Sequence, residues 1–322
     1  MKAIAFFLFA SAAIAAEAPG AGSGGVPDAV VAADGSGQYL TVQEAVNASP
    51  GVNGPPRAWT ILIKPGTYRG LVYVQREKRR LHLLGTEPGS TILTFDLYAS
   101  CPGPDGRPIG TFRTPTVQVD ADDFTAENLT FANSAGARGQ ALAVRVDGDR
   151  AIFRNCRFLG WQDTILDNRG RHYYERCTIY GAVDFIFGGA TSFFDHCQIV
   201  CRGDGYITAP STPPEQPFGF VFADCSVEGE SGAVRTYLGR PWRPYGSSLF
   251  LRTRMSEVVR SSGWNNWEQP DREKTARFSE SASFGAGAAP AARVSWARRL
   301  TDAEAAAITI KRVLGGADGW VP

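Results

Sequence analysis

One six-residue pattern recurs five times in the middle of the chain, and it restricts the possible folds of the 322 residues more than any other feature. Apolar and polar residues alternate within each copy, and successive copies follow every 20 to 28 residues. The copies are Ala126 to Phe131, Phe153 to Phe158, Tyr174 to Ile179, Phe194 to Ile199 and Phe222 to Val227. Because such alternation is typical of a half-buried strand, the repeat predicts one equivalent strand in each turn of a repeating structure.

A repeat of this length, with no helical pattern between the copies, favours a β-solenoid in which parallel strands stack coil upon coil. We therefore predict an all-β fold, a right-handed parallel β-helix. Its stacked strands align one column of residues, namely Leu129, Cys156, Cys177, Cys197 and Cys225. The alternative is a β-sandwich, which needs hairpin turns; Asp147-Gly148 and Asp204-Gly205 are candidates for such turns. The recurring motif fits the solenoid better.

Short capping helices are expected at the ends, because the terminal coils of a solenoid need covers. Residues Thr41 to Glu44 form a capping box that begins one short helix. Residues Thr301 to Glu304 form a second box, and the helix after it should run toward Lys311 and end at Gly315 and Gly316. Ordinary surface helices would show the same local signals.

The first residues have the features of an export signal. Lys2 supplies a positive end, and Ile4 to Ala16 is a short apolar run that finishes in small residues. A membrane anchor is the alternative, but the run is shorter than the roughly 20 residues that span a bilayer. We therefore expect a signal peptide over residues 1–16, a flexible linker over 17–30 and a single catalytic domain over 31–322. The product would be secreted, into a periplasm or out of the cell, with no membrane attachment afterwards.

Charge and metal-ligand patterns exclude several classes of function. A formal net charge of +1 lacks the concentrated basic excess of a nucleic-acid-binding protein. The six cysteines show no zinc-type spacing, and His82, His172 and His196 each lack a second ligand at metal spacing. We interpret the histidines as structural or surface residues, and we expect no metal, no other cofactor and a monomer.

Two aspartates occupy equivalent places in the repeat. Asp163 lies seven residues after Cys156, and Asp184 lies seven residues after Cys177. Adjacent strands are about 4.8 Å apart, so the two carboxyl groups should face each other, and the pKa of one should rise to leave an acid beside a base or nucleophile. Two alternatives remain: Asp204, seven residues after Cys197, suggests a mere ladder of turn residues, and such a pair also suits a retaining glycosidase.

Four ordered segments carry a resemblance to a known family. They are Gly139 to Ala141, Gly160 to Leu166, Gly181 to Gly188 and Tyr237 to Trp242. In order and spacing they resemble the signature blocks of the pectinesterase (pectin methylesterase) family, and the resemblance runs from about Val31 to Trp267. It implies a carboxylic ester hydrolase whose substrate is methyl-esterified homogalacturonan, the polygalacturonate of pectin. The products would be methanol and pectate.

The same resemblance implies roles for five residues. Asp184 would be the nucleophile that attacks the C6 ester carbonyl, and Asp163 would protonate the leaving methanol and then act as base on water. Gln140 and Gln162 would hold the oxyanion. Arg240 would orient Asp184 and keep it ionised. A hydrolase or lyase that cleaves the polymer backbone, and a non-catalytic carbohydrate-binding homologue, are the alternative functions.

Aromatic residues and cysteines complete the expectations drawn from the family. Trp242 and Phe187 match positions that line the substrate cleft, with Val183 close by, although aromatic residues are more often packed in a core. Trp264 and Trp267 are expected to be structural. Cysteines 177 and 197 match a pair that is bonded in some bacterial members, so a disulfide is expected there; a column of free thiols is the alternative.

Overall fold

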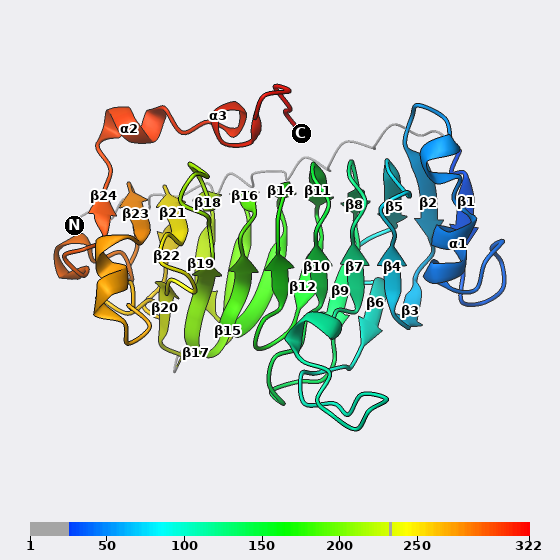
Figure 1. The fold of residues 1–322 in the computed structure, drawn as a ribbon, viewed down its shortest axis with the longest axis horizontal. Helices are drawn as coiled ribbons and strands as arrows, with labels where there is room; N and C mark the ends of the chain where they lie inside the picture. The colour runs from blue at the N-terminus through cyan, green and yellow to red at the C-terminus, as the bar shows by residue number, and fades with distance from the viewer. Residues whose placement is uncertain (1–25, 232–233) are drawn as a thin grey trace, which may run out of the picture.

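The computed structural model describes residues 26–231 and 234–322, and they form a right-handed parallel β-helix (Figure 1). The named strands pair only in parallel in the described part of the chain, and right-handed crossovers are the rule for such strands. The predicted fold class is therefore confirmed, and the sandwich is excluded. The proposed signal peptide and most of the proposed linker lie outside the described residues. Strand β1 begins at Ala29, two residues before the expected start of the domain.

The strands lie in two long sheets. The 11-stranded sheet contains β1 (Ala29–Val31), β2 (Trp59–Ile63), β5 (Leu81–Gly85), β8 (Thr125–Glu127), β11 (Ala151–Arg154), β14 (Arg171–Glu175), β16 (Thr191–Asp195), β18 (Phe220–Ala223), β21 (Ser247–Leu251), β23 (Arg277–Ser281) and β24 (Arg298–Arg299), in that order. The 13-stranded sheet contains β3 (Gly66–Arg69), β4 (Val72–Val74), β6 (Thr91–Phe95), β7 (Val117–Val119), β9 (Thr130–Asn133), β10 (Val144–Val146), β12 (Arg157–Leu159), β13 (Ile165–Asp167), β15 (Thr178–Gly188), β17 (Gln198–Pro210), β19 (Ser226–Gly229), β20 (Thr236–Gly239) and β22 (Arg254–Met255).

The 13-stranded sheet is made of two rows of strands that meet in its longest members. One row runs through β6, β9 and β12, the other runs through β7, β10 and β13, and both pair with β15. Strands β15 and β17 pair with each other over the whole width, with two irregularities in register. In the middle coils the two rows are thus joined by a bend within the continuous strands β15 and β17. The two aspartates lie at this join.

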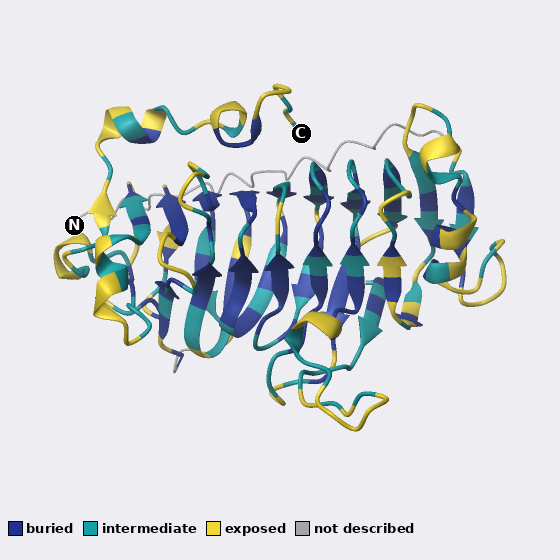
Figure 2. Cartoon of the chain, viewed as in Figure 1, coloured by how far each residue is buried: buried dark blue, intermediate teal, exposed yellow. Residues whose placement is uncertain are grey.

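Buried residues recur along the stacked strands (Figure 2), and aromatic rings stack in the interior of the helix. The rings of Tyr174, Phe194, Phe222 and Phe250 lie parallel, with centroids 4.6 Å apart for the first pair and 4.4 Å for the next two. Three of these residues begin copies of the sequence repeat. The repeat is therefore a core pattern, since in-register stacking buries the same aromatic position on each coil.

The cysteine column is present, but the predicted Cys177–Cys197 disulfide is wrong. All six cysteines are free thiols. The Sγ atom of Cys177 points to the carbonyl of Phe153, 3.5 Å away, and that of Cys197 points to the carbonyl of Tyr174, 3.4 Å away. Because stacked coils hold these side chains parallel, each thiol faces the main chain of the preceding coil, and the two sulfur atoms form no bond.

Both capping boxes form, but the two ends of the chain use their helices differently. Helix α1 (Val42–Ala48) buries Val42, Ala45 and Val46 against the first coil. The expected C-terminal helix is divided into α2 (Asp302–Ala306) and α3 (Ile310–Leu314), because the Thr309 side chain caps a new helix. These two helices lie along the outer side of the 11-stranded sheet rather than over the last coil (Figure 1). Short 3₁₀ turns occur at Gly51–Asn53, Thr111–Arg113, Pro270–Lys274 and Pro290–Ala292.

Candidate active site

The main chain sets the two aspartates in register, as the repeat predicts. Gln162 forms a parallel bridge with Val183, and the Asp163 N–H donates a hydrogen bond to the Val183 carbonyl at 3.0 Å. Asp163 and Asp184 both have left-handed backbone conformations, with φ of 63° and 51°. Such a conformation costs a non-glycine residue about 1 kcal/mol, and it interrupts the alternation of side chains along the strand. Both carboxyl groups line the same cleft.

Asp204 does not continue this pair into a ladder. Strand β17 pairs Gly181 with Cys201 but Val183 with Tyr206, so it carries extra residues at this point. The bulge leaves the Asp204 side chain 63% exposed, where it accepts a hydrogen bond from the Arg235 N–H at 2.7 Å. The alternative of a simple aspartate ladder is therefore wrong for this coil.

The cleft has a volume of about 410 Å³, within the range of small-molecule sites. It brings together seven of the eight residues expected from the sequence. Its lining consists of Thr111, Phe112, Gln140, Gln162, Asp163, Asp184, Phe187, Ala209, Arg240, Trp242 and Trp267. Val183, the eighth, does not line the cleft; its contribution is the main-chain pairing with Gln162.

Arg240 forms a two-point ion pair with Asp184. Its Nε atom donates to Oδ1 at 2.9 Å and its Nη2 atom donates to Oδ2 at 2.6 Å. The guanidinium group lies between two rings, 3.8 Å from the centroid of Tyr206 and 3.7 Å from that of Trp267. Stacking and the fixed fork of donors hold the cation in one orientation. Arg240 therefore fixes the position of the Asp184 carboxylate.

The surroundings separate the proton affinities of the two acids. Burial raises the pKa of Asp163 well above its usual range, and the charge of Asp184 raises it further. Burial also raises the pKa of Asp184, but the hydrogen bonds and charge of Arg240 oppose that rise. The charge of Arg240 lowers the pKa of Asp163 less than burial and Asp184 raise it, and none of the described cations forms an ion pair with Asp163. Asp163 therefore holds its proton when Asp184 is already ionised. The site then contains a carboxylate beside a neutral carboxylic acid.

Two free amides border this acid pair. Gln140 and Gln162 lie on neighbouring coils and are joined by a parallel main-chain bridge. Within the described residues, neither side-chain amide forms a hydrogen bond to another protein group, and both line the cleft. Their N–H groups are thus available to an oxygen atom that enters the cleft beside the acids.

Aromatic rings form the wall of the cleft. The Phe187 ring is 4% exposed and meets Trp242 edge-on, with centroids 5.8 Å apart, so Phe187 both packs and borders the cavity. The centroid of the Phe112 ring is 6.3 Å from that of Trp242, and Phe112 is 46% exposed. A shallow wall of rings of this kind suits the apolar faces of a sugar.

Four residues that line the cleft were not predicted from the sequence: Thr111, Phe112, Ala209 and Trp267. Trp267 was expected to be structural, but it lines the cleft and stacks on Arg240. Trp264, in contrast, is 1% exposed and stacks on Phe278 in the core, as expected. Thr111 and Phe112 lie in a 3₁₀ turn of a long loop, and no periodic signal in the sequence marks them. The only sequence signal for this part of the cleft was the presence of an aromatic residue, Phe112, in a loop.

The family model that matches this chain is Pectinesterase, and the match covers residues 28–317. The chain belongs to the pectinesterase family. Pectinesterase 31 of Arabidopsis thaliana is 43% identical over 281 residues, which are 85% of this chain and 88% of that protein. This pectinesterase is therefore a carboxylic ester hydrolase.

Solved structures show the same relationship. A pectin methylesterase from carrot is 34% identical with a TM-score of 0.85, covering 92% of this chain and 96% of that one. A pectin methylesterase in complex with hexasaccharide VII is 31% identical with a TM-score of 0.80, covering 93% and 100%. The β-helix fold of this chain is thus the fold of solved pectin methylesterases.

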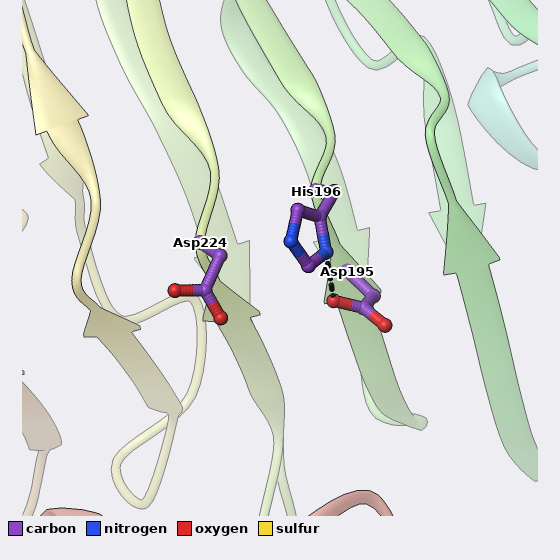
Figure 3. Close-up of side chains that lie close together, drawn as sticks. All are labelled: Asp195, His196 and Asp224. Carbon is purple, nitrogen blue, oxygen red and sulfur yellow. Dashed lines mark hydrogen bonds and ion pairs between the residues drawn. The ribbon is translucent and has the colours of Figure 1, made fainter. Parts of the chain in front are cut away.

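A second group of polar side chains lies on an outer corner of this pectinesterase (Figure 3). Ligand atoms of Asp195, His196 and Asp224 come within 4.8 Å of one another. His196 Nδ1 is 2.6 Å from Asp195 Oδ1, and Tyr173 donates to the other oxygen of Asp195. Both oxygens of Asp224 accept hydrogen bonds from Arg252 at 2.7 Å. Because protein donors already hold these carboxylates, the group does not require a metal ion.

No helix among the described residues is long and apolar enough to cross a membrane.

Proposed function

We propose that this pectinesterase hydrolyses the C6 methyl esters of galacturonate units in pectin through an acyl-enzyme on Asp184. The observation that carries the proposal is the asymmetry of the acid pair. Arg240 bonds both oxygens of Asp184, whereas no cation in the described part of the chain forms an ion pair with Asp163. An ionised nucleophile and a neutral acid side by side are what acyl transfer with an alcohol leaving group needs.

In the first half of the reaction, a carboxylate oxygen of Asp184 attacks the ester carbonyl carbon. The carbonyl oxygen becomes an oxyanion, to which the free amides of Gln140 and Gln162 donate. The tetrahedral intermediate collapses by breaking the bond to the methoxy oxygen, and Asp163 transfers its proton to that oxygen. Methanol leaves, and the sugar C6 is joined to Asp184 as an anhydride.

In the second half, water replaces methanol. Asp163 is now a carboxylate and takes a proton from water as the water oxygen attacks the C6 carbonyl. The same amides stabilise the second oxyanion, and cleavage of the anhydride returns Asp184 as a carboxylate and Asp163 as an acid. The sum is one ester and one water converted into one carboxylic acid and one methanol.

The polymer would lie along the cleft with a sugar face on Trp242. The hexasaccharide bound by a solved relative supports a chain of several sugars as ligand. We further propose that the protein acts as a monomer and is exported, since pectin is a cell-wall polymer. Neither proposal affects the chemistry above.

The test is methanol release from highly methylated pectin, with polymer length followed in the same reaction. Wild-type protein should release methanol and leave the polymer long, and Asp184→Ala should release almost none. Asp204→Ala is the matched control, because it removes an aspartate of equivalent sequence spacing that lies outside the cleft. Shortened chains without methanol would indicate a hydrolase or lyase of the backbone, and binding of pectin with neither product would indicate a carbohydrate-binding protein.

A further inference from the structure

Four polar side chains meet in the interior of the β-helix, apart from the residues that line the cleft. They are Asp167, His172, Tyr174 and Ser192, each 0% exposed, and we call them the core cluster. Oδ1 of Asp167 accepts a hydrogen bond from the Tyr174 hydroxyl at 2.6 Å and lies 3.0 Å from Nδ1 of His172. Oδ2 accepts from the Ser192 hydroxyl at 2.6 Å. Because a buried carboxylate is costly unless it is paired and hydrogen-bonded, these three partners stabilise Asp167 in the core.

The ring of His172 lies between two acceptors. Its Nε2 atom is 3.0 Å from the carbonyl oxygen of Gly148, and its Nδ1 atom faces the carboxylate of Asp167. Both ring nitrogens can donate only in the imidazolium form. Burial lowers the pKa of His172, but the charge and hydrogen bond of Asp167 raise it overall. The core cluster therefore contains an ion pair, and loss of one proton leaves a buried carboxylate without its cation.

Few other groups act on the charge of His172. The neighbouring strands β11 and β16 place Ala151 and Ser192 beside it. Besides the two titratable groups of the core cluster, the acid that faces His172 is Asp149, in the turn before β11. Nε of Arg171 donates to Asp149 at 3.0 Å, and Nη2 donates to its other oxygen at 2.5 Å. Since Arg171 holds Asp149, the proton on His172 depends mainly on the core cluster.

Strand β13 connects the core cluster with the active site. Its last residue, Asp167, bonds side chains of β14 and β16 and so ties the 13-stranded sheet to the 11-stranded sheet across the interior. On the other face of β13, Leu166 packs with Phe187, which borders the cleft. Asp163 precedes Asp167 by four residues, so their Cα atoms are at most about 14 Å apart. A shift of Asp167 would therefore disturb both the cleft wall and the acid.

We propose that Asp167 and His172 are positioning residues that, through β13, hold Asp163 and the cleft wall in their active arrangement while His172 is protonated. Without that proton the end of β13 has to move or admit water, because an unpaired buried charge is strongly destabilising. Asp163 then leaves its place beside Asp184. This inference rests on the proposed function, and it adds to the requirements for activity a second proton, which stays in the core.

The alkaline limb of the rate profile should report both protons. Asp163 must hold its proton as the acid and His172 must hold its proton in the core, so activity is lost as pH rises through the two pKa values. Log kcat/KM for methanol release should fall by up to roughly two per pH unit in wild type and by about one in His172→Gln. The control is His82→Gln, which replaces a histidine of β5 outside the cleft and should keep the wild-type slope.

A second variant changes the proton affinity of the core cluster and keeps its ring packing. Burial and then the charge of Asp167 raise the pKa of Tyr174 well above its usual range, so its hydroxyl keeps its hydrogen and donates it. Tyr174→Phe removes this donor, and the carboxylate of Asp167 should then bind the proton of His172 more strongly. The steep part of the alkaline limb should move to higher pH by about one unit. A purely structural contact would lower the rate without this shift.

Hydrogen exchange tests the positioning without any turnover. The protection factors of the β13 amides, compared with those of β9, should fall about tenfold as the His172 ring loses its proton, which NMR follows in the same sample. In His172→Gln this step should be absent. If His172→Gln failed to fold, Tyr174→Phe and the exchange of the wild type would decide the proposal.

Equal alkaline slopes in wild type and His172→Gln would overturn the proposal, as would constant β13 protection while the His172 ring titrates. If no form of the protein released methanol, the esterase function would fall, but the exchange measurement would still decide whether the core proton holds β13.

Discussion

Substitution of Arg240 by lysine tests how the acid pair is kept unequal. Arg240→Lys retains the positive charge but replaces a two-point fork, with bonds of 2.9 and 2.6 Å to Asp184, by a single ammonium group. It also removes the flat cation between the rings of Tyr206 and Trp267. The ionised form of Asp184 should therefore lose one of its two charge-assisted bonds.

The magnitude follows from that bond. A hydrogen bond to a charged group contributes about 1.5 to 3 kcal/mol, and one pKa unit corresponds to about 1.4 kcal/mol. Removal of one bond from the ionised form should raise the pKa of Asp184 by roughly one to two units. Asp184 must be ionised to attack, so the acidic limb of the kcat/KM profile should move to higher pH by that amount. The loss should be about ten- to hundredfold on the acid side and smaller as pH rises.

The assay is methanol release from one pectin sample across the pH range, with Tm measured for each protein. Arg252→Lys is a matched control, because Arg252 bonds both oxygens of Asp224 at 2.7 Å but lies outside the cleft. Its pH profile should coincide with that of wild type. If Arg240→Lys lowered the rate by the same factor at every pH, the argument that Arg240 governs the ionisation of Asp184 would be refuted.

Three further predictions concern single side chains. Gln162→Leu should lower kcat about a hundredfold with little change in KM, because it removes a donor to the oxyanion; equal losses in kcat and affinity would contradict this. Trp267→Leu should lower kcat without lowering Tm, whereas Trp264→Leu in the core should lower Tm, as differential scanning calorimetry would show. Burial lowers the pKa of His172, but the charge of Asp167 and its bond to the imidazole outweigh burial and raise that pKa overall. The stability that this pair contributes is therefore complete below the ordinary histidine pKa of about 6.5 and is lost at higher pH. The decline in Tm above neutral pH should disappear in His172→Gln.

The architecture could be predicted because one short pattern repeats on five successive coils in the middle of the chain. An aromatic residue begins four of the five copies and stacks in the core, as Tyr174 and Phe194 show. The capping boxes at Thr41 and Thr301 were equally local and both form. The local pattern does not indicate where a helix packs. No residue near Thr301 indicates that the C-terminal helices turn back along the outer face of a sheet, where Leu314 becomes buried.

The site residues that the strand register positions could be predicted from the sequence, and those that loops position could not. Asp163 and Asp184 share one offset from the cysteine column, so counting was enough to pair them. Asp204 shares that offset too, but the bulge in β17 moves it away, and a bulge leaves no mark in spacing alone. Phe112 and Trp267 enter the cleft from loops, whose paths depend on packing over the whole coil.

The disulfide prediction failed for a reason that also explains why the site works. In-register stacking brings equivalent residues on adjacent coils close together but makes their side chains parallel, and the thiols of Cys177 and Cys197 accordingly face main-chain carbonyls. Asp163 and Asp184 are likewise equivalent residues on adjacent coils, and both take left-handed conformations, with φ of 63° and 51°. Both carboxyl groups thus leave the regular pattern of the coil together and meet over one cleft. The repeat brings the two aspartates close together. Their reactivity comes from the left-handed conformations that interrupt the regular strand and from Arg240, which bonds only Asp184 of the two acids.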